Sequence, residues 1–264
     1  MWRLFKIEWL KIKTYRTFWV LYLSFMVFSP VFLIFVAYKF MNAKYGNIQE
    51  RTLSTLLGTP FVFPKIWHTS SYFAGIFFIV LAMLYILLIT NEVQYRTHRQ
   101  NIIDGWSRMD FLKAKFSMLL FFVISATVTV FIGALIVGMI YTPSGADMME
   151  GTYFIAYFAL MATAYLMVAF LIAILVKRTG LSIIIYFVVV VIVDNLLWLS
   201  LTIKGSQAGY FMPMETVDSL VPNPSGLLRT RTLDDYVLVI AAFAYLIVYA
   251  YIIINHFRKT DLKT

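Results

Sequence analysis

The feature that most constrains this chain is a series of long apolar runs. Each is about as long as the 20 residues that a helix needs to cross the hydrocarbon core of a bilayer. The runs cover residues 17–40, 71–90, 116–141, 153–176, 181–201 and 236–254. Transmembrane β-strands would instead appear as alternating segments of about 10 residues. The pattern therefore predicts an all-α integral membrane protein with six transmembrane helices, forming one membrane domain over residues 1–264.

Composition supports this fold class and narrows the chemistry. Charged residues make up 13% of the chain, whereas soluble domains carry about 25%. The chain has no cysteine, which excludes disulfides, thiol catalysis and Cys-ligated metals. The formal charge is +9, and in a membrane protein such an excess reflects cytoplasmic loops and anionic lipid. We therefore expect membrane lipids as partners and no nucleic acid.

The distribution of Lys and Arg predicts the orientation. Fifteen of the 22 lie in the first 16 residues, in residues 91–115, at 177–178 and after the last run. Because basic loops stay in the cytoplasm, both termini and the 91–115 segment are predicted to be cytoplasmic. The longer outer loops are then 41–70 and 202–235. Within the second, "AGYFMPMETVDSLV" is apolar enough to lie at the outer interface as short or re-entrant helices, and a solvated, loosely ordered loop is the alternative.

Residues 1–16, "MWRLFKIEWLKIKTYR", predict a helix before the first span. Its aromatic and apolar stripe consists of Trp2, Phe5, Trp9 and Ile12, and its basic stripe of Arg3, Lys6 and Lys13. This pattern is typical of an elbow helix in the membrane interface, with aromatics in the acyl boundary and basic groups near lipid phosphates. A plain cytoplasmic extension of the first span is the alternative.

Residues 91–115, "NEVQYRTHRQNIIDGWSRMDFLKAK", form a polar island between the second and third spans. Its first part has no helix breaker, and Gly105 then interrupts the pattern. Ser107 and Asp110 are spaced as a capping box, so the third span is predicted to begin near Arg108. The island therefore reads as helix, turn and capped helix.

The island carries groups suited to docking on another protein. Three arginines have guanidinium groups that can each donate two hydrogen bonds to a carboxylate: Arg96, Arg99 and Arg108. Its apolar anchors are Ile102, Ile103 and Trp106, and Trp and Arg are enriched at interface hot spots. The same arginines also suit a loop that only enforces topology and contacts lipid phosphate. Composition leaves both interpretations open.

The order of residues in the island resembles the cytoplasmic signature of permease subunits of type-two ATP-binding-cassette (ABC) transporters. The matching positions are Glu92, Thr97, Gly105, Ser107, Arg108, Phe111 and Lys115. The opening "FKIEWLKIKTYRTFW" is similar to the basic elbow of that family. Arg96 stands where the family often has Gly, and Gly105-Trp106 stands where a Pro often precedes Ser-Arg.

The resemblance implies a coupling helix near residues 94–105, seated in a cleft of a separate cytosolic ATPase that binds ATP and Mg. It implies a second permease copy or a sister permease, a multi-pass location in the bacterial cytoplasmic (inner) membrane, and export. The ATPase-coupling residues would be Glu92, Arg96, Thr97, Arg99, Ile102, Ile103, Gly105, Trp106, Ser107 and Arg108. The chain has no G-x-x-x-x-G-K-[ST] phosphate loop, so we expect neither enzymatic activity nor a cofactor of its own.

Asp194 and Asn195 lie within the fifth apolar run. An ionisable group in mid-bilayer is costly and suggests a function, here a substrate path, a dimer interface or a cation site. A structural hydrogen bond between helices is the alternative. Two other functions stay open: an ion-coupled secondary transporter or channel using Asp194, and a non-transporting scaffold or membrane enzyme. The three histidines are far apart in sequence, and no metal or catalytic motif is expected.

Overall fold

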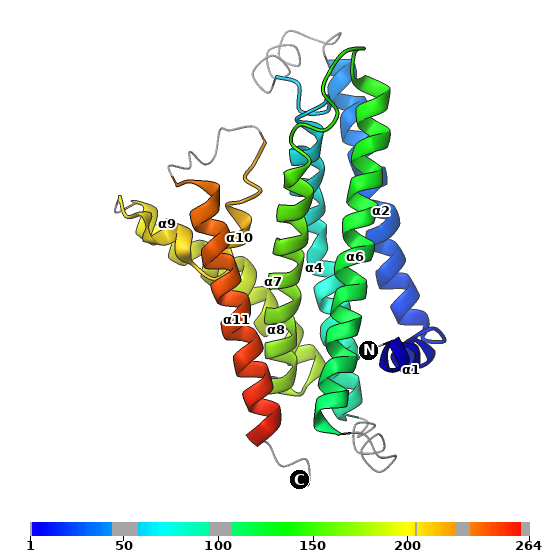
Figure 1. Cartoon of the computed structure of the whole chain (residues 1–264), viewed down its shortest axis with the longest axis vertical. Helices are drawn as coiled ribbons and strands as arrows, with labels where there is room; N and C mark the ends of the chain where they lie inside the picture. Colours follow the sequence, from blue (N-terminus) through cyan, green and yellow to red (C-terminus); the bar gives the residue numbers. More distant parts are fainter. Residues whose placement is uncertain (1, 44–57, 95–106, 204, 225–232, 260–264) are drawn as a thin grey trace.

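The computed structural model describes residues 2–43, 58–94, 107–203, 205–224 and 233–259. Within these ranges six helical segments are long and apolar enough to cross a membrane, which confirms the predicted spans. They are α2 (Arg16–Ala43), α4 (Ile66–Gln94), α6 (Arg108–Tyr141), α7 (Tyr153–Val176), the helix made by α8 (Thr179–Phe187), η1 (Val188–Val193) and α9 (Asp194–Ile203), and α11 (Asp235–Lys259). Figure 1 shows most of them running along the long axis of the molecule.

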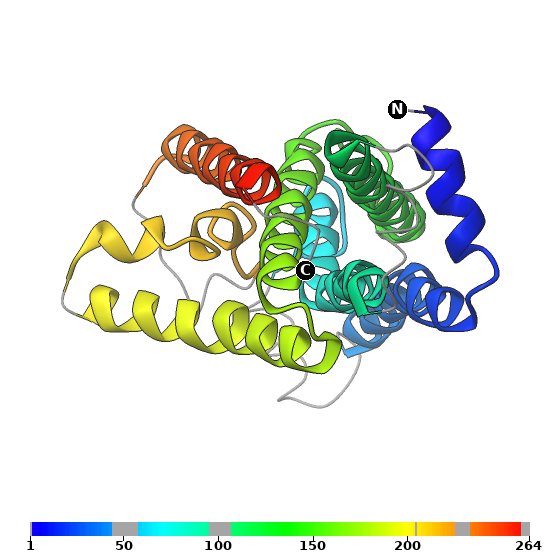
Figure 2. The ribbon, with the colours of Figure 1, turned by 90° about the horizontal axis from the view of Figure 1, so that it is seen from below.

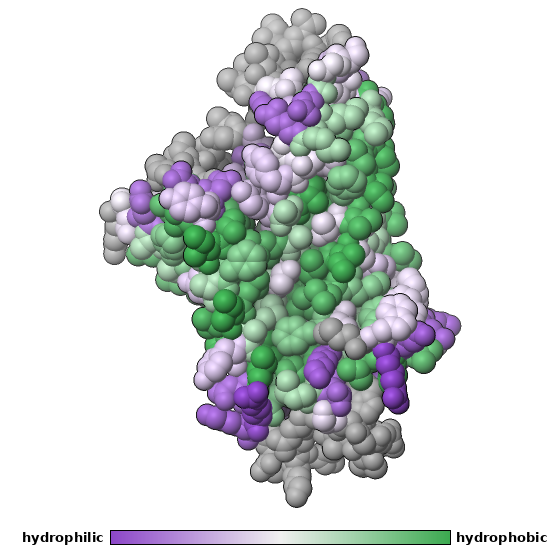
Figure 3. Space-filling model, viewed as in Figure 1, coloured by the Kyte–Doolittle hydropathy of each residue, from purple (hydrophilic) through white to green (hydrophobic). Residues whose placement is uncertain are grey.

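α4 and α7 form the centre of the bundle. They make the most extensive helix–helix contact, and α4 also packs on α2, α6 and α8, while α7 packs on α6, α8 and α11. Side chains between them, such as Phe78, Leu81 and Phe158, are fully buried. The α8–η1–α9 helix leans away from this centre and forms one edge of the molecule (Figure 2). An apolar belt lies between more polar ends on the face shown in Figure 3, as expected for a bilayer-spanning bundle.

α2 continues through Pro30 without a break in the helix. Gly133 of α6 faces this proline, and a Cβ added there would lie 3.3 Å from the Pro30 Cβ. The lack of a side chain on Gly133 therefore lets the two helices approach closely at this point. Small residues serve the same purpose at helix contacts in other membrane proteins.

α1 (Trp2–Ile12) is a helix at the position predicted for the elbow, and it lies crosswise to the spans, seen end-on in Figure 1 and lengthwise in Figure 2. Part of its aromatic stripe packs on the bundle. Phe5 and Trp9 pack on Phe121 of α6, with ring centroids 5.7 and 5.5 Å apart, and Ile12 is buried. Only Trp2 of the stripe is exposed, at 69%. The bundle therefore covers part of the apolar face of α1, and the contact of its aromatic side chains with the acyl boundary stays a prediction.

The segment between the fifth and sixth spans contains two short helices, η2 (Gln207–Phe211) and α10 (Glu215–Asp218). α10 contacts α7, α9 and α11, and Met214, Val217 and Leu220 are buried. In the part of this segment that the structure describes, the predicted short helices are present in place of a solvated loop, and they pack on the bundle, which the sequence did not predict. α10 lies between α7 and α11 in Figure 1.

Candidate functional site

A cluster of four charged side chains lies at the end of the bundle where α1 crosses α4 and α6. The Lys115 Nζ lies 2.5 Å from Glu8 Oε2 and 2.6 Å from Glu92 Oε1. Lys11 Nζ lies 2.8 Å from Glu8 Oε1 and 3.6 Å from Glu92 Oε1. Two carboxylates and two ammonium groups therefore balance one another. We call these four residues the ionic cluster.

Three of the four residues of the ionic cluster are largely buried, and Lys11 is 31% exposed. The side chains of Glu8 and Lys115 are each 2% exposed, and that of Glu92 is 13% exposed. Burial by itself raises the pKa of Glu8, but the ammonium groups of Lys115 and Lys11 outweigh it and lower the pKa below its usual range. Glu8 is therefore a carboxylate at neutral pH. Charges this deep are costly unless each has its counter-ion, so all members depend on one another.

The ionic cluster joins three separate elements. Glu8 belongs to α1, Glu92 lies in the last turn of α4, and Lys115 lies in the second turn of α6. The Tyr85 hydroxyl of α4 also donates to the Lys115 carbonyl at 2.9 Å. Residues 92 and 115 bracket the segment between α4 and α6. The cluster thus ties the two ends of that segment to each other and to the elbow.

The start of α6 is fixed by the capping box that the sequence predicts. The backbone N–H of Asp110 donates to the Ser107 hydroxyl oxygen at 3.1 Å, and the Ser107 N–H donates to an Asp110 carboxylate oxygen, also at 3.1 Å. These bonds satisfy backbone donors that a helix start otherwise leaves unpaired. Helix α6 consequently begins at Arg108, one residue after its cap, and not at the start of the apolar run.

We expect Ser107→Ala to destabilise the start of α6 by about 1 kcal/mol, the usual cost of losing a side-chain N-cap. Hydrogen exchange of residues 108–112 would report the loss as faster exchange confined to this turn. Ser117→Ala is the control, because the Ser117 hydroxyl only donates to the Ala114 carbonyl within the helix. Equal exchange in the two variants would contradict the capping role.

Most of the predicted coupling residues lie outside the described part of the chain. These are Arg96, Thr97, Arg99, Ile102, Ile103, Gly105 and Trp106. Of the others, Ser107 is the cap of α6, Arg108 is its first residue, and Glu92 belongs to the ionic cluster. The structure therefore brings Glu92 together with two residues that the prediction did not include as site residues, Glu8 and Lys115.

Asp194 forms a second buried polar contact, in the opposite half of the bundle. Its carboxylate accepts the backbone N–H groups of Met214 at 3.1 Å and Glu215 at 2.7 Å. The side chain is buried, and it follows the π-helical turn η1 directly. Asp194 thus holds the beginning of α10 against the fifth span, as the predicted structural alternative has it. Asn195 is not part of this contact, and it lines a neighbouring cavity instead.

Sequence reasoning missed Glu8, although a signal for it was present. It is the only acid in α1, and it lies at i+3 from Phe5 and i–4 from Ile12, on the face that packs against the bundle. A lone acid on the apolar face of a basic helix indicates a buried partner. Lys115 was recognised as a signature position, but its spacing from Glu92 gave no sign that the two side chains meet.

Comparison with known proteins places these features in a family. The chain matches the family model described as "ABC-2 family transporter protein" over residues 4–193. This range includes all of α1 but its first two residues, the first four spans, α8 and η1 of the fifth span, and the entire ionic cluster. No curated protein and no solved structure matches the chain.

The matched range is well over half of the 264 residues, so the chain belongs to the ABC-2 family of transporter membrane proteins. It is a multi-pass membrane protein and a permease domain, a class that is not itself catalytic. Members of this class generally work with a cytosolic ATPase and often as dimers. Residues after 193, among them α9, α10 and α11, lie beyond the match.

Proposed function

We propose that this chain is the membrane-spanning subunit of an ABC exporter, powered by a separate cytosolic ATPase that docks on residues 91–115. The ATPase binds ATP and Mg, and this chain supplies no catalytic residue. It works as a dimer with a second copy or a sister permease, in the bacterial cytoplasmic (inner) membrane. Its family membership supports the permease role, and the ionic cluster is the observation that carries the docking site.

The argument from the ionic cluster is mechanical. A docked ATPase can move the membrane helices only if the docking segment, residues 91–115, transmits the movement and does not simply deform. Glu92 and Lys115 are 23 residues apart in sequence, yet their side chains are hydrogen-bonded. Both ends of the docking segment are therefore held together, and α1 is held to them through Glu8. A displacement of the segment would reach α4 and α6 together.

The route from α4 into the bundle supports the same proposal. α4 is the helix that packs on α2, α6, α7 and α8. At its inner end the Thr90 hydroxyl lies 2.8 Å from the Thr179 hydroxyl at the start of α8. Movement of α4 would therefore be passed to the central helix α7 and to the fifth span. We infer that the bundle responds as a unit to the docking segment.

The test is recovery of the ATPase with the tagged permease in mild detergent. We expect a protein with a phosphate-loop motif to co-purify in stoichiometric amount. Arg96→Glu with Arg99→Glu should reduce its recovery at least about tenfold, because reversing charges at an interface costs several kcal/mol. Membrane insertion should be unchanged.

The matched control is Arg258→Glu with Lys259→Glu. These residues are exposed at the end of α11, and the pair makes the same change in charge. Recovery of the ATPase with this control but not with the 96/99 pair would support docking on 91–115. Equal recovery with both pairs would overturn that docking site, and no ATPase with the wild type would overturn the exporter proposal.

The alternative of an ion-coupled transporter using Asp194 receives no specific support. Its carboxylate accepts two backbone amides from the α10 segment, which accounts for a buried acid at that depth. Among the described residues, no group of three or more His, Asp or Glu is arranged to hold a metal ion. The role as an ABC exporter subunit coupled to a cytosolic ATPase is therefore the proposed function.

A further inference from the structure

The fifth span contains a π-helical turn, η1, between α8 and α9. The backbone N–H of Asp194 donates to the carbonyl of Val189, five residues earlier, whereas an α-helix bonds each N–H to the carbonyl four residues earlier. All six residues of η1 are valine or isoleucine, and of these Val190 is buried. π-helices are rare, occur mostly as single turns within α-helices and are frequent at functional sites. A π turn at this point of the span therefore calls for a physical reason.

The π turn decides which residue of the fifth span faces the bundle. Tyr186 and Asp194 are eight residues apart, and both are buried. In a continuous α-helix each residue turns by about 100°, so eight residues would place Asp194 roughly 80° away from the face of Tyr186. Seven residues come within roughly 20° of that face, so Val193 would take the place of Asp194. In this structure Val193 is 41% exposed, because the extra residue in the π turn brings Asp194 onto the buried face.

Asp194 joins two units of the segment between the fifth and sixth spans. The first unit is α9 with η2, where Gly209 allows a close contact: a Cβ there would lie 2.9 Å from the Thr202 Oγ1 and 3.0 Å from the Trp198 carbonyl oxygen. The second unit is α10, which packs on α7 and α11 of the bundle. The Asp194 carboxylate connects them by accepting two backbone N–H groups at the start of α10. A rotation of α9 would remove this connection.

A further hydrogen bond holds α9 and η2 in the same position. The Tyr245 hydroxyl of α11 donates to the Phe211 carbonyl of η2 at 2.6 Å. Because η2 is packed on α9, a rotation of α9 would break this bond as well. Against it stands the Thr202 hydroxyl of α9, which is buried without a hydrogen bond to any described residue, a costly arrangement. A small number of hydrogen bonds thus sets the balance between the π turn and a continuous α-helix.

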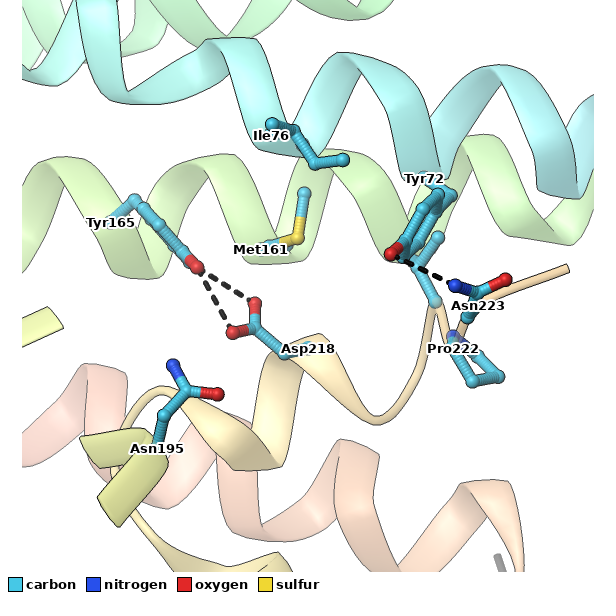
Figure 4. A pocket seen from close by; sticks show the side chains of 10 residues that line it. Tyr72, Ile76, Met161, Tyr165, Asn195, Asp218, Pro222 and Asn223 are labelled. Atoms are coloured by element: carbon cyan, nitrogen blue, oxygen red, sulfur yellow. Dashed lines mark hydrogen bonds between the residues drawn. The ribbon is translucent and has the colours of Figure 1, made fainter. Parts of the chain in front are cut away.

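The register of η1 also affects a neighbouring cavity. The Asn195 side-chain amide donates to the Val191 carbonyl at 3.1 Å, and Figure 4 shows the side chain pointing toward Asp218 of α10. Asn195 lines a cavity of about 310 Å³ together with residues of α4, α7 and the α10 segment. A rotation of α9 by about 100°, one residue of an α-helix, would move Asn195 out of this wall.

We propose that η1 is a register switch in the fifth span. In the π register, which this structure shows, Asp194 holds α10 and Asn195 lines the cavity. In the α register Val193 takes the place of Asp194, α9 and η2 are rotated by about 100°, and α10 is released from the fifth span. Packed elements with two discrete arrangements are a common basis of conformational change. The switch lies within one chain and does not depend on ATPase docking, so it is tested on the purified permease.

Pairs of introduced cysteines report the register, because the chain has no cysteine of its own. Val193→Cys with Met214→Cys, the 193/214 pair, brings two thiols together in the α register. Ile192→Cys with Met214→Cys is the control pair. Ile192 is 43% exposed in the π register, and in the α register it lies roughly 120° from the face of Tyr186. In maltoside micelles we expect a short bismethanethiosulfonate linker to join the 193/214 pair faster than the control pair.

Deletion of Val191 should abolish the switch. Without this residue Asp194 is seven positions from Tyr186, so a continuous α-helix keeps its carboxylate on the face of α10. Linking of the 193/214 pair should then fall to the rate of the control pair. The proposal is overturned if the 193/214 pair links no faster than the control pair in the chain without the deletion. It is also overturned if the deletion leaves the rate of the 193/214 pair unchanged.

Tyr245→Phe shifts the balance in the opposite direction and needs no deletion. Loss of its hydrogen bond to Phe211 should raise the linking rate of the 193/214 pair about fivefold, the factor for one net hydrogen bond. Tyr251→Phe is the matched control, since it makes the same change on α11 at a side chain that is 68% exposed. Equal linking rates in these two variants would overturn the switch even if the deletion variant does not fold.

Discussion

Lys115→Met is expected to lower the free energy of unfolding by about 3–5 kcal/mol, the cost of removing one partner from a buried ion pair. Glu8 and Glu92 would remain close together, and their ion pairs with Lys11, which is 31% exposed, would be left to compensate them. Unfolding in mixed detergent micelles measures this change. Lys113→Met is the control, because Lys113 is exposed on the same turn of α6, and equal stability of the two variants would contradict the role of the cluster.

A triple variant of the ionic cluster tests separately whether the cluster contributes to the free energy of unfolding and whether it couples ATPase activity to the membrane helices. Glu8→Gln, Glu92→Gln and Lys115→Met together remove the three most buried charges of the cluster and leave only the Lys11 ammonium, which is 31% exposed and can be hydrated. Replacing buried ion pairs by neutral residues is often neutral for stability. We expect this triple variant to recover most of the stability lost in Lys115→Met. If the cluster transmits movement from the docked ATPase, coupled ATPase activity should stay low in the triple variant. Wild-type coupling there would restrict the cluster to a structural role.

Asp194→Leu is expected to release the α10 segment from the fifth span. The change leaves the backbone N–H groups of Met214 and Glu215 without their acceptor, at about 1–3 kcal/mol for each buried donor left unpaired. Hydrogen exchange over residues 205–221 should rise by the corresponding factor, while α4 and α7 stay protected. Asp194→Asn keeps one acceptor oxygen and should give an intermediate result.

Ser200→Ala is the matched control for Asp194→Leu, since the Ser200 hydroxyl of α9 donates to the Leu197 carbonyl within its own helix. Its exchange pattern should equal that of the wild type. If Asp194→Leu exchanged like this control, the two amides would have another acceptor, and Asp194 would have to be explained by a role other than anchoring α10.

Local features of this structure were predictable from the sequence. The six spans follow from the length of apolar runs, and the fourth agrees residue for residue with α7 at 153–176. The Ser107–Asp110 capping box was also predictable, because its two residues are three apart and their contact needs only a helix start. Both predictions depend on interactions within a few residues.

The polar contacts that join distant segments were not predictable. Glu8 and Lys115 are 107 residues apart, and each on its own looks like a charge that faces lipid phosphate or water. The same holds for Asp194 and the amides of residues 214 and 215, since backbone donors carry no sequence signal. The sequence places Asp218 in the outer loop 202–235, and only the packing of α10 brings it to Tyr165. These contacts depend on tertiary placement, which periodicity does not encode.

The distance between Glu8 and Lys115 along the chain also sets an order of events during synthesis. At about 5–20 residues per second, Lys115 is translated roughly 5–20 s after Glu8. During that interval Glu8 has no permanent counter-ion from α6, and a carboxylate does not enter an apolar environment unpaired. The elbow helix therefore has to wait at the membrane surface until the third span has been made. Docking of the first helix in the sequence is one of the later steps in biogenesis.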